Sequence, residues 1–564
     1  MKFEEMKKHI PNEKVYSKKI EELCNELDNA SSKDEAYKVV KKYFKLSDNY
    51  ESDVTIISIR NTIDTTDKEY EKAIEKINEV GPVISNEFQK FEKKLLTCKF
   101  RKELEEKLSP YYFLRIENSL KVFDEKIIPE IVEENKLTTE YKKLLASAQL
   151  EFKGETLNLS QIGKYMTSSD KTTREEAAKL YYGFLEENDA KIGEIYDRLV
   201  HIRDTKAKKM GFENFVDFGY ISLGRSDYNS KDVAGYRDQI YKTVVPVVKK
   251  LRKRQAERLG IKNPDFLDFN LEYLSGNAKP IGNSEFLVKQ AQKMYHEMSK
   301  ESGEFFDFMV ENHLMDLDAK KGKAGGGYMT YIPKYKSPFI FANSNGTSQD
   351  VDTLTHEVGH AFQGYLGSKI QVPGFRMPTL EACEIDSMSM EFFAWPWMNL
   401  FFGDQDDKYR FSHLDSAISF LPYGVEVDEF QHWVYENVDA THEERCAKWA
   451  ELEKKYRPWL KFKSVPYVGK GKYWMRQAHI FEVPFYYIDY TLAQVLALQF
   501  KCEMDKDREK AWKKYIKLLK MGGKYPFVEL ITKAHLRNPF IDGNVKKVIK
   551  PQVKVLDSFD DKKF

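Results

Sequence analysis

The feature that most constrains the fold is a helical spacing of apolar residues along most of the chain. From Phe3 to about Leu180, segments such as KVYSKKIEELCNEL and EKAIEKINEVGPVISNEFQKFEKKLL place apolar residues three and four positions apart, with Lys and Glu between them. The same spacing returns later and continues to the end of the chain. We therefore expect a mainly α-helical protein whose charged runs are solvent-exposed helix faces.

Two breaks in this pattern suggest how the chain is organised. The first break spans Gly154 to Ser169, where turn residues mix with polar ones. In addition, a chain of 564 residues is longer than one compact core usually needs, which favours more than one domain. We therefore expect an N-terminal helical domain over residues 1–180 and a second domain over residues 181–564. The second break, Lys321 to Thr347, contains glycines and the β-prone pieces GYMTYI and SPFIFAN, which predict a small hairpin or sheet.

Charge, hydropathy and cysteine content exclude several classes of partner. The chain has 90 Lys and Arg against 89 Asp and Glu, so it carries no net field to hold a nucleic acid or an anionic membrane. The N-terminal segment lacks the apolar stretch of a secretory signal, and no run approaches the roughly 18 apolar residues of a membrane span. Five cysteines without CxxC spacing fit a reduced compartment. We expect a cytoplasmic protein with neither nucleic acid nor membrane as partner.

The segment DVDTLTHEVGHAFQGYLG contains a metal-binding pattern. His356, Glu357 and His360 form His-Glu-x-x-His, and residues four apart on a helix lie on one face. Both imidazoles can then reach one cation while Glu357 lies beside it. Ser348 or Asp350 suits the N-cap of this helix, so the helix is predicted independently of the motif.

A catalytic zinc site needs a third protein ligand and an open fourth position. The next carboxylates are Glu381 and Glu384, in MPTLEACEIDSMSMEFFAW, after turn signals in YLGSKIQVPGF that let the chain fold back. Glu384, 24 residues after His360, is the expected third ligand. Glu381, one turn earlier, would accept the ring N–H of a ligating histidine. Their surroundings are mostly apolar or small, where unpaired carboxylates are unfavourable.

Gly359, between the two histidines, is unfavourable within a helix by about 1 kcal/mol relative to alanine. A close approach of the metal, the substrate or the second helix would explain it.

These motifs together resemble the thimet oligopeptidase family of zinc metallopeptidases, in particular its oligoendopeptidase F branch. The resemblance rests on LTHEVGHAFQ followed by EACEIDS, and extends to GGGYMTYIPKYKSPFIFANSNGTSQDVDTLTHE, FLPYGVEVDEFQHWVYEN and AHIFEVPFYYIDYTLAQ, covering roughly residues 200 to 560. It implies a prolate helical body with a deep channel that admits unfolded peptides, and makes residues 181–564 the catalytic domain. It also implies one Zn²⁺ per chain, with His356, His360 and Glu384 as ligands and Glu357 as general base.

The family also uses a histidine and tyrosines of its C-terminal block to bind substrate and stabilise the oxyanion. His479 matches this histidine, although the residues alone, without the resemblance, would favour a structural histidine in the core. Tyr486, Tyr487 and Tyr490 compete for the tyrosine role, and Tyr486 is preferred.

Two further expectations concern substrate contact and structure. The strand-like SPFIFAN, with Phe339, is expected to offer an edge for pairing with an extended peptide. His432, in DEFQHWVY, is expected to be structural.

The predicted function is that of a zinc-dependent oligoendopeptidase hydrolysing internal bonds of short peptides with a metal-activated water. A zinc aminopeptidase is one alternative, but it needs acidic residues for the substrate amine, and the chain shows no Gly-rich exopeptidase motif. A helical interaction scaffold with an inactive metal site is another. The intact set of His356, Glu357, His360 and Glu384 argues against the scaffold.

Overall fold

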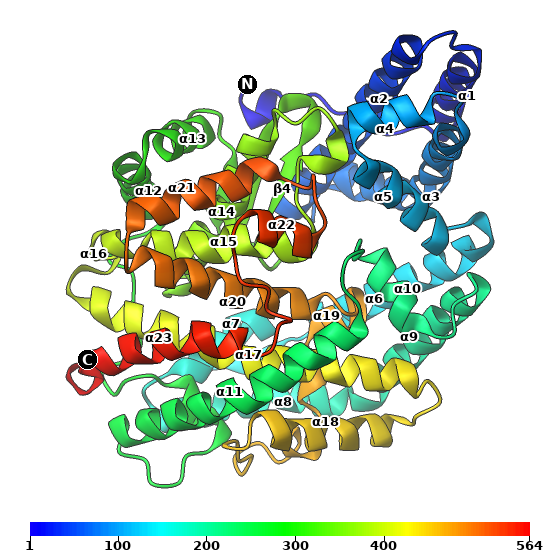
Figure 1. Cartoon of the computed structure of the whole chain (residues 1–564). Helices are drawn as coiled ribbons and strands as arrows, with labels where there is room; N and C mark the ends of the chain where they lie inside the picture. Colours follow the sequence, from blue (N-terminus) through cyan, green and yellow to red (C-terminus); the bar gives the residue numbers. More distant parts are fainter. The chain divides into compact units, whose positions relative to one another are not determined.

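The computed structural model describes residues 1–564 and consists mainly of helices with two small sheets (Figure 1). This confirms the predicted mainly α-helical fold. The chain forms two compact units, which we call unit 1 and unit 2, and each combines three separate segments. Unit 1 comprises residues 1–125, 280–403 and 503–536, and unit 2 comprises residues 126–279, 404–502 and 537–564. The predicted domain division near residue 180 stays a prediction, as do the prolate shape and the channel.

Unit 1 contains the N-terminal helices and the predicted metal motif. Its helices are α1 (Glu13–Asn29), α2 (Lys33–Ile63), α3 (Lys68–Thr97), α4 (Arg101–Leu108), α5 (Pro110–Val122), α12 (Ser284–Met298), α13 (Lys300–Glu311), α14 (Gln349–Gly367), α15 (Leu380–Phe393), α16 (Asn399–Phe402), α21 (Arg508–Met521) and α22 (Phe527–Lys533). Its strands are β3 (Met315–Asp318), β4 (Tyr328–Ile332) and β5 (Ser337–Ser344).

Unit 2 contains the C-terminal block with the predicted substrate-binding histidine. Its helices are α6 (Ile128–Ala146), α7 (Leu159–Gly163), α8 (Lys171–Glu187), α9 (Asp189–Lys209), α10 (Phe215–Ser222), α11 (Ser230–Arg258), α17 (Asp406–Glu436), α18 (His442–Tyr456), α19 (Ala478–Glu482), α20 (Tyr487–Met504) and α23 (Asn544–Ser558). A hairpin of β1 (Leu150–Phe152) and β2 (Glu155–Leu157) lies near the first predicted break.

The sheet of unit 1 has the strand order β3-β5-β4 and packs against α14. β4 and β5 are antiparallel, as the two β-prone pieces predict, whereas β3 pairs with β5 in parallel and was not expected. Because β5 has a partner on both sides, the prediction that SPFIFAN offers an edge to a peptide is wrong. Phe339 is also not a substrate contact, because its side chain is 1% exposed and its ring packs 4.4 Å from that of Phe3.

Helix α14 forms because its apolar residues suit one buried face. Val351, Leu354, Val358 and Phe362 recur at three and four positions and are all buried. Ser348 takes the N-cap position but makes no side-chain cap. The carboxylate of Asp350 instead accepts hydrogen bonds from the backbone N–H groups of residues 345 and 346, at 3.0 and 2.7 Å, and so fixes the loop that enters the helix.

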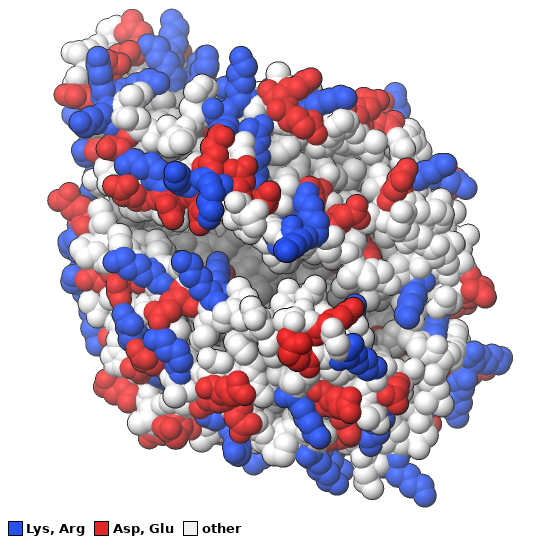
Figure 2. Space-filling model, turned by 180° about the vertical axis from the view of Figure 1, so that it is seen from behind, with Lys and Arg blue, Asp and Glu red and all other residues white.

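The surface carries charges of both signs. Lys and Arg side chains are interspersed with Asp and Glu on the face that Figure 2 shows, in keeping with the balanced composition. None of the helices combines the length and the apolar character needed to cross a bilayer. All five cysteines are free thiols.

Candidate metal centre and active site

The site in unit 1 is built where α14 and α15 cross at close range (Figure 1). Gly359 lies at this contact: a Cβ atom there would be 2.7 Å from the carbonyl oxygen of Asp386 and 2.7 Å from Cα of Ser387. Of the three reasons expected for this glycine, the structure therefore shows the second helix. Only a residue without a side chain lets the two backbones approach this closely.

The three predicted ligands converge between these helices. Nε2 of His356 lies 3.3 Å from Oε2 of Glu384, and Nε2 of His360 lies 3.6 Å from the same oxygen. One ligand atom from each of the three residues falls within 4.8 Å of the others. Two imidazoles and one carboxylate are the donor set of catalytic zinc sites in proteins, so these residues fit a divalent cation.

The orientation of His356 is fixed from its other side. Its Nδ1–H donates to Oε1 of Glu391 at 2.6 Å, which leaves Nε2 directed toward Glu384. Glu391 was not singled out from the sequence, although it follows Glu384 by two helical turns and therefore lies on the same face of α15. Glu381 is buried, with 1% exposure, and its predicted contact with a ligating histidine stays a prediction.

The buried charges of the site favour an ionised third ligand. Burial alone would raise the pKa of Glu384, but the neighbouring His360 and His356 hold that pKa well below its ordinary value. Burial would lower the pKa of His356, but hydrogen bonds to Glu384 and Glu391 raise it well above the ordinary value. The carboxylate therefore stays charged at neutral pH, as a metal ligand must be.

Glu357 stands apart from the three converging groups. Its side chain is 7% exposed, and its Oε2 is buried without a hydrogen-bond partner. Burial raises the pKa of this carboxyl, although the nearby His356 and His360 partly oppose the shift. A buried carboxylate with one unpaired oxygen and a raised pKa is suited to accept and return a proton.

We expect Glu391→Gln to weaken metal binding by on the order of 10- to 100-fold, because an amide is a poorer acceptor for the His356 ring N–H. Titration of metal-free protein with zinc in competition with a chromophoric chelator measures this change. Glu75→Gln, at an exposed position of α3, is the matched control. Equal zinc affinity in the two variants would contradict the role given to Glu391.

His479 and the three candidate tyrosines form one cluster in unit 2. His479 lies on α19, and its ring centroid is 6.1, 5.0 and 5.6 Å from those of Tyr486, Tyr487 and Tyr490, respectively. Nε2 of His479 is 3.4 Å from the hydroxyl oxygen of Tyr490. The structure thus brings the predicted residues of the C-terminal block together, and the preference for Tyr486 stays a prediction.

His432 behaves as a structural histidine. Its side chain is buried, and its Nε2 lies 3.0 Å from the hydroxyl oxygen of Tyr220. Burial lowers the pKa of His432 to about 4, so the ring is neutral at pH 7.

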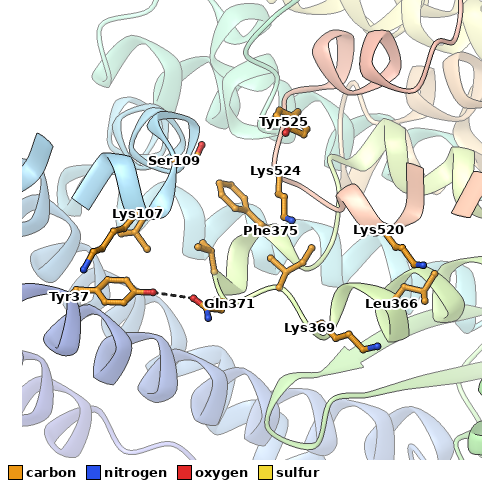
Figure 3. Close-up of a pocket in the computed structure, with 13 residues that line it drawn as sticks. Tyr37, Lys107, Ser109, Leu366, Lys369, Gln371, Phe375, Lys520, Lys524 and Tyr525 are labelled. Atoms are coloured by element: carbon orange, nitrogen blue, oxygen red, sulfur yellow. Dashed lines mark hydrogen bonds between the residues drawn. The ribbon is translucent and has the colours of Figure 1, made fainter. Parts of the chain in front are cut away.

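A separate pocket of about 560 Å³ in unit 1 lies where the chain leaves α14 (Figure 3). Its lining combines an apolar floor that includes Phe375 with the side chains of Lys107, Lys369, Lys520 and Lys524. None of the predicted site residues lines this pocket. It is therefore distinct from the candidate metal centre.

Comparison with known proteins defines the class. The sequence model of the family described as peptidase family M3 matches residues 164–548 of this chain. The sequence model of the peptidase M3 N-terminal domain matches residues 3–123. The chain belongs to peptidase family M3.

Individual relatives agree with this family. The fold matches a structure of Pz peptidase A with an inhibitor at a TM-score of 0.96 and 44% identity, and a structure described as an oligoendopeptidase F at 0.97 and 45%; each match covers 100% of both chains. An oligoendopeptidase F homolog of Borreliella burgdorferi is 27% identical over 247 residues, which is 41% of this chain and 41% of that relative. These findings confirm the predicted resemblance to this family and to its oligoendopeptidase F branch. They also confirm that the protein belongs to a class of metallopeptidases that are endopeptidases.

Proposed function

We propose that this protein is a zinc-dependent oligoendopeptidase that hydrolyses internal bonds of short, unfolded peptides. The observation that carries the proposal is the convergence of His356, His360 and Glu384 within 4.8 Å, with the buried Glu357 beside the two histidines on α14. Two imidazoles and one carboxylate suit zinc and leave a position open, although the same donors also accept cobalt or manganese. The membership in peptidase family M3 supports peptides as the substrate class.

Each residue then has a defined task. A zinc ion, when bound, supplies a Lewis acid that makes water a competent nucleophile at neutral pH. His356 and His360, through Nε2, and the carboxylate of Glu384 would hold the ion, and Glu391 keeps the His356 ring in the required orientation. Glu357 takes the proton of the attacking water and returns it to the leaving amine nitrogen.

The oxyanion formed from the peptide carbonyl needs further hydrogen-bond donors. We assign this task to His479 and one tyrosine of its cluster, with Tyr486 preferred, on the strength of the family resemblance. Donors that act mainly on the developing charge raise turnover rather than affinity. A cytoplasmic location is likewise a proposal, supported by five free cysteines.

Removal and return of the metal tests the proposed function. A quenched fluorescent peptide with several internal bonds should be cleaved by the metal-loaded protein, lose cleavage after treatment with a chelator, and regain it with about one equivalent of zinc. Mass analysis should place the cuts at internal bonds.

The same assay separates the two alternatives. Cleavage that requires a free N-terminal amine, compared with an N-acetylated copy of the peptide, would replace the proposal with an aminopeptidase. A zinc content far below one per chain, together with no cleavage, would favour the interaction scaffold.

A further inference from the structure

We propose that Gln477 and Tyr423 are positioning residues that hold His479 in the tautomer with its hydrogen on Nε2, so that the ring presents an N–H donor to the peptide carbonyl. The proposal rests on the function proposed above, in which His479 stabilises the oxyanion. All three residues belong to unit 2.

A hydrogen bond fixes the role of Nδ1 in His479. The side-chain Nε2 of Gln477 lies 2.8 Å from Nδ1 of His479. An amide nitrogen can only donate, so Nδ1 must accept with its lone pair. A neutral imidazole that accepts at Nδ1 carries its single hydrogen on Nε2.

A second hydrogen bond orients the amide of Gln477 itself. The hydroxyl of Tyr423, on α17, donates to Oε1 of Gln477 at 2.7 Å. Burial raises the pKa of Tyr423 well above its ordinary value, so the phenol keeps its hydrogen at all working pH values. In this arrangement the phenol donates to the carbonyl end of the amide, and the nitrogen end faces His479.

The ring of Tyr423 is itself held in place. It packs edge-on against Trp449, Tyr473 and Tyr487, with centroids 6.3, 5.9 and 5.8 Å away. Side chains fixed by packing position their hydrogen-bond partners more precisely than mobile ones do. The series of hydrogen bonds from Tyr423 through Gln477 to His479 is therefore fixed at Tyr423.

An amide, and not a carboxylate, is the partner of Nδ1 in His479. In unit 1 the carboxylate of Glu391 receives the Nδ1–H of His356, so in the metal-loaded protein the lone pair of Nε2 would be left for the cation. In unit 2 an amide donates to Nδ1, so the hydrogen of His479 lies on Nε2. With the metal bound, the two histidines would thus have opposite tautomers, one suited to bind a cation and the other to bind an anion.

The contact of His479 with Tyr490, at Nε2, is a long one. Nε2 is 3.4 Å from the hydroxyl oxygen of Tyr490, which is longer than an ordinary hydrogen bond between these groups. Tyr486 and Tyr487 contribute rings beside the imidazole, and Glu482 of the same helix is paired with Lys142 at 2.8 Å. A peptide carbonyl oxygen that approaches Nε2 would form a shorter bond than the one it replaces.

Gln477→Glu provides a diagnostic change of one atom. A carboxylate can only accept, so Nδ1 becomes the protonated nitrogen and the neutral ring turns a lone pair toward the substrate. In this variant, Nε2 of His479 regains its N–H donor only when both ring nitrogens are protonated. We expect turnover at pH 8, relative to wild type at the same pH, to fall on the order of 10- to 100-fold and to recover toward pH 6.

Two controls accompany this variant. Gln405→Glu makes the same chemical change at the N-cap of α17, where the side chain makes no cap contact, and should follow the wild-type profile at every pH. Tyr423→Phe removes the anchor of the amide but leaves Gln477 in place, and should give a smaller loss of turnover at pH 8 than Gln477→Glu does.

Nitrogen-15 spectra of the imidazole rings test the tautomer without reference to catalysis. We would use zinc-loaded, full-length protein labelled at histidine, and identify the signals of His479 as those missing from His479→Gln. At pH 8 we expect the hydrogen of His479 on Nε2 in the wild type and on Nδ1 in Gln477→Glu. A wild-type hydrogen on Nδ1, or a turnover ratio of Gln477→Glu to wild type that is constant with pH, would overturn the proposal. The expected spectra in a protein that cleaves no peptide would instead reject the proposed function and leave the tautomer assignment standing.

Discussion

Glu357→Gln is expected to remove nearly all peptide cleavage while the protein retains its metal. The amide has the size of the carboxyl group but cannot accept the proton of an attacking water, and a positioned general acid–base contributes on the order of 10²- to 10⁴-fold to the rate. Because Glu357 is not one of the three converging ligands, zinc content should stay at that of the wild type. Measuring kcat/KM on the fluorescent peptide and zinc per chain on the same sample checks both statements.

The folded state should tolerate this change. Glu357 is buried with an unpaired Oε2 and a raised pKa, so it contributes no ion pair whose loss would destabilise the protein. We expect a thermal midpoint no lower than that of the wild type. Glu75→Gln serves again as the surface control with unchanged activity. Cleavage by Glu357→Gln within a few-fold of wild type would show that another group takes the proton.

Gly359→Ala is expected to disrupt the metal centre although it adds a single methyl group. The new Cβ would lie 2.7 Å from two backbone atoms of residues 386 and 387 and 3.0 Å from Cβ of Met390. Backbone cannot rotate away as a flexible side chain can, so α15 must move and carry Glu384 away from the histidines. Overpacking of this kind is unfavourable by about 1–3 kcal/mol, against about 1 kcal/mol gained from the helix preference of alanine.

The matched control for this variant is Gly364→Ala on the same helix. There the nearest atom to a new Cβ is a side-chain carbon of Tyr331 at 3.4 Å, which is an ordinary contact. We expect Gly364→Ala to keep its zinc affinity and gain stability slightly, and Gly359→Ala to lose both zinc affinity and cleavage. Equal zinc affinities in the two variants would show that the crossing of α14 and α15 does not set the geometry of the site.

Local patterns in the sequence predicted the parts of the site that depend on local geometry. His356 and His360 share a helix face because they are four residues apart, and this holds in any surroundings. Glu384 could be predicted because turn signals precede it and the chain near it is apolar. The reason for Gly359 could be narrowed to three possibilities, and only the structure shows which of them applies.

Other features depend on contacts that no local pattern reveals. β5 is a central strand only because β3, from an earlier part of the chain, pairs with it, and this pairing made the edge prediction wrong. The partnership of Glu391 with His356 requires the antiparallel register of α14 and α15. Helix α21 joins unit 1 from a distant segment, where the hydroxyl of Tyr515 donates to the carbonyl oxygen of Asp386 at 2.6 Å.

The hydrogen bond between His356 and Glu391 ties two parts of the metal centre to one helix. Helix α15 carries Glu384, which is a candidate ligand, and also Glu391, which orients the ring of a second candidate ligand on α14. A displacement of α15 would therefore disturb both at once, and metal affinity should fall in a single step and not ligand by ligand.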